Sequence, residues 1–303
     1  MRLVATAGQE SRIRVGTAGA SSPAGVPGSA GVVSAAGVVS AAGAPAPAGV
    51  PDAAEVPGSA GVSVPVATEP PPGAQGIFGS VFPLAQRYAE MLATDGIIRG
   101  LIGPREAARL WDRHLLNCAV VADLVPRPAM LLDIGSGAGL PGIVLAMLLP
   151  EVQVTLLEPM ARRVKFLDEC RAGLGLGNVV VRRGRAEEVR GQVRADVITA
   201  RAVAPLDRLA ALAMPLVRPG GTVLAMKGQR AAAEADAASR VLRRLGVTDV
   251  AVLRAGVGKI SPPATVVRLI AGNRPLDSAG TAGPRKSRPR PGAARGKAAR
   301  TPR

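Results

Sequence analysis

The sequence has few aromatic residues, few cysteines and a single histidine. Aromatic residues make up 2% of the 303 residues, and the cysteines and histidine are Cys118, Cys170 and His114. Such a set is too small for a disulfide framework or for a zinc site of known spacing. No nucleophile and base pair can be recognised either. The cysteines therefore predict a chain that works in a reducing, cytoplasmic compartment.

Long apolar runs are also missing. No stretch reaches the roughly 20 apolar residues that a membrane-spanning helix needs. No unbroken apolar segment follows Arg2, as a signal peptide would require. We therefore expect no binding to a membrane. We also expect no metal, and the sequence leaves the oligomeric state open, with a monomer favoured.

The two ends of the chain differ in composition from its middle. Residues 1–73 are mostly Ala, Gly, Val, Pro and Ser, which offer too few large side chains to offset the entropy of ordering, so we expect disorder there. Residues 274–303 form a basic tail with nine Lys and Arg and one acid, in a chain of net charge +16. Such a tail either attracts a polyanion by counterion release or only keeps the protein in solution. The middle is also positive, which favours a nucleic-acid partner.

The middle of the chain alternates between helical and strand-like patterns. Residues 77–125 show helical spacing, with Trp111, Leu115 and Cys118 on one stripe that we expect to be core. Seven strand-like runs follow: LLDIG, VQVTLLE, NVVVRRG, ADVITAR, GTVLAMKG, DVAVLRAG and ATVVRLIAG. Five strand and helix alternations with a terminal strand pair predict an open, mostly parallel, doubly wound α/β sheet.

Ligands of such a sheet bind beyond the carboxyl ends of its strands, so the residues at those ends are the candidates for a site. The first run leads into a turn with glycine at Gly135, Gly137 and Gly139, preceded by Asp133. Glycine lets the backbone turn tightly and lets a ligand approach its amides. The candidates at the following strand ends are Glu158, Ala186, Glu187, Arg201 and Lys227.

The spacing of the glycines separates two cofactor classes. A dinucleotide loop has the pattern GxGxxG, and its third glycine would fall at position 140, where Leu140 stands. The pattern present is DxGxGxG, which resembles the first motif of the class I S-adenosylmethionine-dependent methyltransferases. An acid such as Asp133 suits the ammonium of that cofactor better than a diphosphate. Glu158 is placed to accept hydrogen bonds from both ribose hydroxyls.

Six segments resemble the glucose-inhibited division protein B family of 16S rRNA methyltransferases: LIGPRE…RLWDRHLLNC, LLDIGSGAGLPGIVLA, LLEPMARRVKFL, RGRAEE, ADVITARAVAPL and RPGGTVLAMKG. The resemblance covers about residues 77–273. The resemblance implies a methyltransferase domain at 74–273, with a helical N-terminal part at 77–125 and a Rossmann-like, cofactor-binding α/β part at 129–273.

The resemblance also implies a reaction, which is methylation of guanine N7 in the decoding-site loop of 16S rRNA with S-adenosylmethionine as cofactor. The partner would be 16S rRNA or the small ribosomal subunit. Matched residue by residue, the family's cofactor contacts fall on Gly135, Leu140, Ala186, Glu187 and Arg201. The backbone of Ala186 would face the adenine, and the carboxylate of Glu187 would face its amino group.

Guanine N7 exposes a lone pair, so its methylation needs no general base and depends on proximity and alignment. We therefore expect no acid–base catalytic residue. The forked donors of Arg201 suit a cofactor or substrate contact, although pairing with Glu187 is the alternative. Lys227 is a hypothetical phosphate contact. A methyltransferase of another RNA, a protein or a small molecule, and a non-catalytic RNA-binding protein, remain alternatives.

Overall fold

The structure is a computed structural model that describes residues 69–273. The expected disorder of residues 1–73 and the RNA-binding role of residues 274–303 therefore concern segments that lie almost wholly outside the described residues. Only Glu69–Gly73 is described, and it leads through a turn into the first helix.

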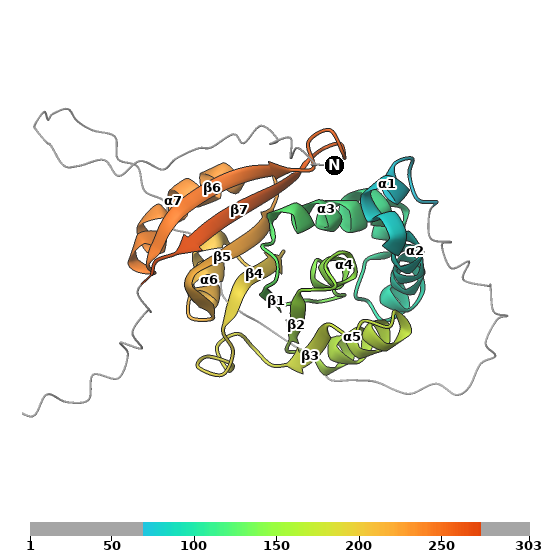
Figure 1. Cartoon of the computed structure of the whole chain (residues 1–303), viewed down its shortest axis with the longest axis horizontal. Helices are drawn as coiled ribbons and strands as arrows, with labels where there is room; N and C mark the ends of the chain where they lie inside the picture. The colour runs from blue at the N-terminus through green and yellow to red at the C-terminus, as the bar shows by residue number, and fades with distance from the viewer. Residues whose placement is uncertain (1–68, 274–303) are drawn as a thin grey trace, which may run out of the picture.

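In the described residues, seven strands form one sheet in the order β3-β2-β1-β4-β5-β7-β6, in which β7 alone runs antiparallel to its neighbours (Figure 1). The strands are β1 (Met130–Ile134), β2 (Gln153–Glu158), β3 (Val179–Arg183), β4 (Ala195–Arg201), β5 (Val217–Lys227), β6 (Val247–Ala255) and β7 (Ala264–Ala271). All seven coincide with the strand-like runs of the sequence. The expected open, mostly parallel, doubly wound α/β sheet is thus confirmed.

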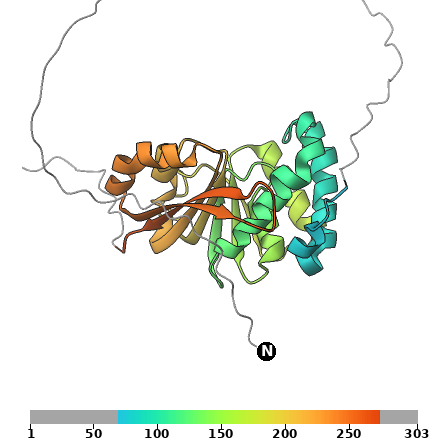
Figure 2. The same ribbon diagram turned by 90° about the horizontal axis from the view of Figure 1, so that it is seen from above.

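Helices cover both faces of this sheet, because each strand carries apolar side chains on both sides. The helices between strands are α4 (Gly142–Leu148), α5 (Ala161–Gly173), α6 (Leu206–Ala213) and α7 (Ala231–Arg244). Buried residues of α4 and α5 form one core cluster, and those of α6 and α7 form another. Figure 2 shows α7 and the N-terminal helices at opposite ends of the sheet.

One connection differs from the expectation of five strand and helix alternations. The chain passes from β3 to β4 through turns, with no helix between Gly184 and Arg194. This short stretch is interrupted by Gly191, whose φ is 75°, and it supplies few apolar side chains for a helix to bury.

The expected helical region before the sheet is present as several short pieces. The α-helices in it are α1 (Ala74–Phe78), α2 (Phe82–Met91) and α3 (Leu116–Ala119), and the tighter or wider helical turns are η1 (Gly79–Val81), η2 (Leu92–Gly96), η3 (Pro104–Arg109), η4 (Leu110–Leu115) and η5 (Val120–Leu124). Trp111 packs edge-on against Phe78, with ring centroids 6.1 Å apart, and is buried as expected, together with Leu115 and Cys118.

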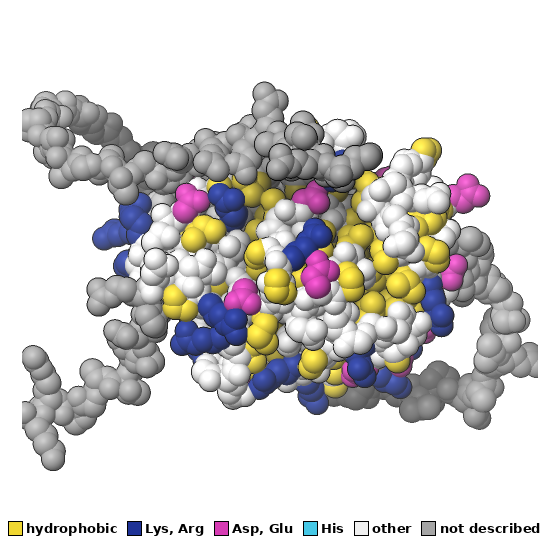
Figure 3. Space-filling model, in the orientation of Figure 1, with side chains coloured by type: hydrophobic (Ala, Val, Ile, Leu, Met, Phe, Trp, Pro, Cys, Tyr) yellow, Lys and Arg dark blue, Asp and Glu magenta, His cyan; other side chains and the backbone are white. Residues whose placement is uncertain are grey.

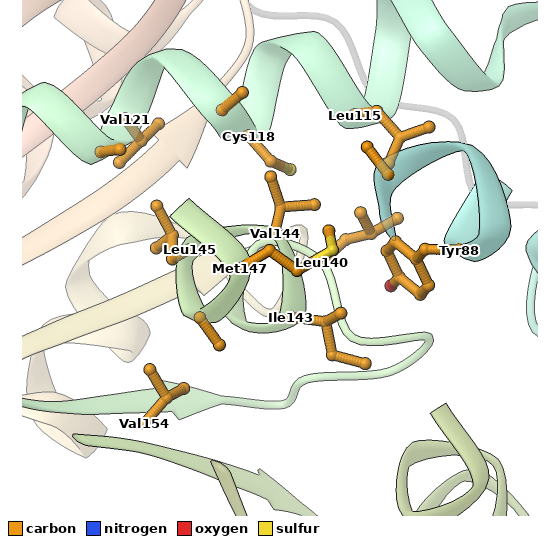
Figure 4. Packing of buried hydrophobic residues seen from close by; sticks show 14 of the residues in the cluster. Tyr88, Leu115, Cys118, Val121, Leu140, Ile143, Val144, Leu145, Met147 and Val154 are labelled. Carbon is orange, nitrogen blue, oxygen red and sulfur yellow. The ribbon is translucent and has the colours of Figure 1, made fainter. Parts of the chain in front are cut away.

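The N-terminal helical region packs directly on α4. Figure 4 shows Cys118 and Val121 facing Val144 and Leu145 of α4. This contact fixes α4, and therefore the glycine turn that precedes it, against the region before the sheet.

Basic side chains gather along the lower edge of the face drawn in Figure 3, below β3 and α6.

None of the helices in residues 69–273 is both long enough and apolar enough to cross a membrane.

Candidate functional site

The glycine turn after β1 is tied to the end of β2. The backbone N–H groups of Gly135 and Ser136 donate to the carbonyl of Leu157 at 2.8 and 3.2 Å. Gly137 has φ of 60°, in the left-handed region, and its N–H donates to the Glu158 carboxylate at 3.0 Å. A Cβ at Gly137 would meet only the Gly135 carbonyl, at 3.8 Å, so it would project into open space. The turn therefore presents bare backbone toward a cavity.

The back of the same turn is packed against α2. The buried Tyr88 hydroxyl donates to the Ala138 carbonyl at 2.6 Å, and burial raises the pKa of Tyr88 well above its usual range. A Cβ at Gly139 would come within 2.8 Å of this hydroxyl and within 2.5 Å of Ile143. Figure 4 shows Tyr88 beside Leu140 and Ile143. Gly139 is therefore needed for packing behind the turn, whereas Gly137 lies at its front.

Asp133 points into the protein. Its side chain is 1% exposed, and its Oδ1 accepts a hydrogen bond from the Thr199 hydroxyl at 2.8 Å. Its Oδ2 accepts from the Gly142 N–H at 3.2 Å. Burial raises the pKa of Asp133 to about 6. Both carboxylate oxygens are thus used to join β1, β4 and α4, and the expected contact with the cofactor ammonium, direct or through water, stays a prediction.

Glu158, at the end of β2, lies at the cavity wall although its side chain is 1% exposed. Its two carboxylate oxygens accept from the N–H groups of Gly137 and Met160, each at 3.0 Å. The Arg163 guanidinium lies 3.7 Å from the same carboxylate. Each carboxylate oxygen can accept more than one hydrogen bond, so Glu158 can also bind hydroxyl donors from the cavity.

Arg201, at the end of β4, reaches across to the N-terminal helical region and does not pair with Glu187. Its guanidinium donates to the Cys118 sulfur at 3.5 Å and to the Arg113 carbonyl at 3.2 Å. It also lies 2.6 Å from Nδ1 of His114. The next residue, Ala202, has φ of 54°, an uncommon conformation for a residue with a Cβ. The end of β4 is therefore held in a fixed, locally strained turn.

These elements enclose a first cavity of about 590 Å³ at the carboxyl ends of β1, β2 and β4. This is the point where the strand order reverses, the usual ligand position of such sheets. Of the residues expected from the sequence, the cavity is lined by Gly135, Gly137, Leu140, Glu158 and Arg201.

Ala186 and Glu187 do not line this cavity. Ala186 is buried, and Glu187 is exposed on the turn that follows β3. That turn begins beside Glu158, because the N–H of Gly184 donates to the Glu158 carbonyl at 3.2 Å. The two residues therefore lie just beyond the Glu158 end of the site.

A second cavity, of about 970 Å³, adjoins the first at the ends of β4 and β5 and the start of β7. The residues shared by both cavities are Arg113, Arg201, Ala202 and Val203. The other charged residues in the second lining are Lys227, Arg230, Glu234 and Arg254. The second cavity is therefore strongly basic, and it shares Arg201 and the residues around it with the first cavity.

Lys227 has a structural role in the lining of the second cavity. Its side chain is 11% exposed, and its ammonium donates to the Ala204 carbonyl at 2.7 Å and to the Glu234 carboxylate at 2.8 Å. The ammonium is thus engaged with the turn after Arg201 and with α7, so the hypothesis of a phosphate contact is not supported by its position. Within residues 69–273 no cluster of three or more His, Cys, Asp or Glu side chains could hold a metal.

The N-terminal helical region contributes residues to the first cavity that the strand-end reasoning missed. They include Ile102, Glu106 and His114. His114 was noted in the sequence as the single histidine, yet nothing in the local pattern indicates that it would lie beside the end of β4. The packing of this region on α4 brings it there.

Comparison with known proteins shows the family to which the chain belongs. A family model described as rRNA small subunit methyltransferase G matches residues 82–259. Relatives named ribosomal RNA small subunit methyltransferase G include one from Thermobifida fusca (strain YX), 53% identical over 223 residues, which covers 74% of this chain and 94% of the relative. One from Mycobacterium sp. (strain KMS) is 56% identical over 201 residues, covering 65% and 89%. One from Salinispora arenicola (strain CNS-205) is 50% identical over 238 residues, covering 73% and 98%.

Proposed function

Because the chain belongs to the rRNA small subunit methyltransferase G family, whose members depend on S-adenosylmethionine, we propose that it methylates N7 of a guanine in the decoding-site loop of 16S rRNA. We assign this activity to a domain at residues 74–273, with its helical part at 77–125 and its α/β part at 129–273, acting in the cytoplasm. The observation that carries the proposal is the pair of adjoining cavities that share a wall at Arg201.

The first cavity fits the cofactor. The bare backbone of Gly137 leaves room that a Cβ would fill, and the Glu158 carboxylate beside it suits the ribose hydroxyls. S-adenosylmethionine supplies an electrophilic methyl group on a sulfonium when bound. Gly135 and Leu140 would contact it in the glycine turn. Asp133 and Gly139 would support that turn from behind.

Two further contacts complete the proposed cofactor site. Ala186 and Glu187 follow β3 next to the Glu158 end of the cavity, and they would receive the adenine through a backbone group and a carboxylate. The donors of Arg201 at the other end would be shared between cofactor and substrate.

The second cavity suits the RNA. Its lining includes Arg201, Arg230 and Arg254, and its only acid, Glu234, is paired with Lys227. Such a surface attracts phosphates and favours a polyanion over a neutral small molecule or a basic protein. A guanine inserted there would reach the wall that faces the first cavity.

The chemistry asks little of the side chains beyond placement. N7 of guanine carries its own lone pair, so no proton has to be removed before the methyl group is accepted, and rate depends on alignment. The acids and the histidine of the two linings all have partners. Glu106 pairs with His114, Glu158 accepts from two backbone N–H groups, and Glu234 pairs with Lys227. The chain's residues would therefore bind, orient and exclude water.

The test is mass spectrometry of 16S rRNA from a strain that lacks the protein, its parent and a complemented strain. We expect one 7-methylguanosine in the decoding-site loop to disappear and to return on complementation with the full chain. Unchanged 16S rRNA in the deletion strain would overturn the proposed substrate. Complementation by a Glu158→Gln variant is compared with complementation by the wild-type chain, to test whether methylation depends on the proposed cofactor site.

A further inference from the structure

Three side chains from three separate elements form one hydrogen-bonded chain at the wall between the cavities. The Glu106 carboxylate on η3 lies 2.8 Å from Nε2 of His114 on η4, and Nδ1 of His114 lies 2.6 Å from the Arg201 guanidinium on β4. The side chain of His114 is 12% exposed. All three line the first cavity, and Arg201 lines the second as well.

The donors in this series of hydrogen bonds fix the position of the proton on His114. Arginine has only donors, so Nδ1 of His114 must offer its lone pair to Arg201. The ring proton is then on Nε2, which donates to the Glu106 carboxylate. A second ring proton would place an N–H against the guanidinium and would break the bond to Arg201. His114 therefore holds Arg201 only in its neutral form.

The contacts of Arg201 leave part of its guanidinium without a partner in the described residues, and Arg201 lines both cavities. Three of its five N–H donors are met, in the described residues, by the Cys118 sulfur, the Arg113 carbonyl and His114. Two donors are therefore left for a ligand. The conformational entropy of the long arginine side chain is therefore lost on folding and not on ligand binding. A side chain that is already held in place can align a ligand effectively.

We propose that Glu106 and His114 are positioning residues that hold the Arg201 guanidinium at the boundary between the cofactor cavity and the substrate cavity. The inference rests on the proposed function for its effect on methyl transfer. The arrangement of the three side chains is independent of that function, so the two are tested separately.

The proposal has a pH dependence with a defined sign. The groups that face His114 are Glu106 from η3, Arg201 from β4 and Arg113 from its own segment. Burial, followed by the Arg201 charge, lowers the pKa of His114 below its ordinary value. The neutral ring, and with it the hold on Arg201, therefore persists to a lower pH than for a free histidine and is lost on further acidification.

The first test uses the fact that His114 is the only histidine in the chain. We would label histidine with ¹⁵N in the full chain and follow the two ring nitrogens by NMR against pH. We expect the neutral tautomer with its proton on Nε2, and an Arg201→Met variant should titrate at higher pH. A proton on Nδ1, or the same titration curve in both proteins, would overturn the contact whatever the protein methylates.

The second test compares two amide replacements of His114 in methyl transfer to small ribosomal subunits. The amide oxygen of asparagine can take the place of Nδ1, whereas glutamine places its amide near Nε2 and leaves Arg201 without its acceptor. We expect His114→Gln to lower kcat by about tenfold, and His114→Asn to retain most of it. Equal loss in both variants, with both folded, would overturn the positioning role. An inactive wild-type enzyme would instead count against the proposed substrate, and the NMR result would still decide the contact.

Discussion

Thr199 donates a hydrogen bond to Asp133 at 2.8 Å, and the two residues are direct neighbours in the parallel register of β4 and β1. Thr199 is fully buried and Asp133 is 1% exposed. The bond joins the two strands between which the order of the sheet reverses. The acid of the glycine motif thus supports the site from inside the sheet, and the acid at the strand end that lines the first cavity is Glu158.

Asp133→Asn should change how stability depends on pH. The pKa of Asp133 is raised to about 6 by burial, whereas the unfolded chain has an ordinary aspartate pKa of about 3.9. The folded protein therefore holds this proton more tightly, and its free energy of unfolding falls as pH rises from about 4 through about 6. The change from this residue amounts to about 2–3 kcal/mol.

Urea unfolding at several pH values between 4 and 8 measures this change. The free energy of unfolding should change less with pH in Asp133→Asn than in the wild type. It should also be lower by an amount that does not depend on pH, because asparagine offers one hydrogen-bond acceptor fewer. Asp168→Asn, at an exposed pair with Arg171, is the control and should keep the wild-type slope. Parallel curves for Asp133→Asn and the wild type would contradict the raised pKa.

Gly137→Ala should weaken S-adenosylmethionine binding, because the new Cβ projects into the first cavity. Gly175→Ala is the matched control. Gly175 has φ of 65° against 60° for Gly137, and a Cβ there meets nothing within 4 Å, but it lies on an exposed turn after α5. Both variants should lose about 1 kcal/mol of stability from the left-handed backbone.

Isothermal titration calorimetry with the cofactor separates the two effects of this substitution. Affinity should fall in Gly137→Ala and stay at the wild-type value in Gly175→Ala. If the two variants bound the cofactor equally well, Gly137 would not lie against the ligand.

Glu158→Gln should also reduce cofactor affinity, by about tenfold to a hundredfold, because a charge-assisted acceptor for hydroxyl groups contributes about 1.5–3 kcal/mol. Glu188→Gln is the control, since Glu188 also accepts a backbone N–H, that of Arg185 at 2.9 Å, but lies outside the cavity. Equilibrium binding of S-adenosylhomocysteine measures the difference without turnover. Similar affinities for the two variants would remove Glu158 from the cofactor site.

The double variant Arg230→Ala with Arg254→Ala should weaken binding of small-subunit rRNA and make it less dependent on salt. Both arginines line the second cavity, and removing each phosphate-binding side chain should flatten the slope of log affinity against log salt concentration by about 1. Arg244→Ala, at the exposed end of α7 and outside both cavities, is the control. Filter binding at several salt concentrations gives the slopes, and an unchanged slope would place the RNA elsewhere.

Much of this fold is predictable from the sequence, because the controlling signals are local. The seven apolar runs coincide with the seven strands, and the positive φ angles of Gly135, Gly137 and Gly139 explain why glycine stands at those three positions. Glu158 lies at the first cavity as expected from its place at a strand end. Even Trp111 is buried as its helical stripe predicts.

The direction of each side chain at those strand ends is not predictable in this way. Asp133 and Lys227 occupy expected positions, yet their charged groups bond to Thr199 and to the Ala204 carbonyl inside the protein. A strand end specifies where a residue lies, but the neighbouring elements decide whether its side chain meets a ligand or a protein group.

The sequence by itself determined the sheet, the glycine turn and the family to which the chain belongs, because periodicity and motif spacing act over short stretches of chain. Only the tertiary structure decided that His114 meets Arg201, which lies 87 residues away in the chain. That contact depends on the packing of the N-terminal helical region on α4, which buries apolar side chains from both and leaves the histidine beside the end of β4. Such packing is a property of the assembled core and is not encoded in any single stretch of sequence.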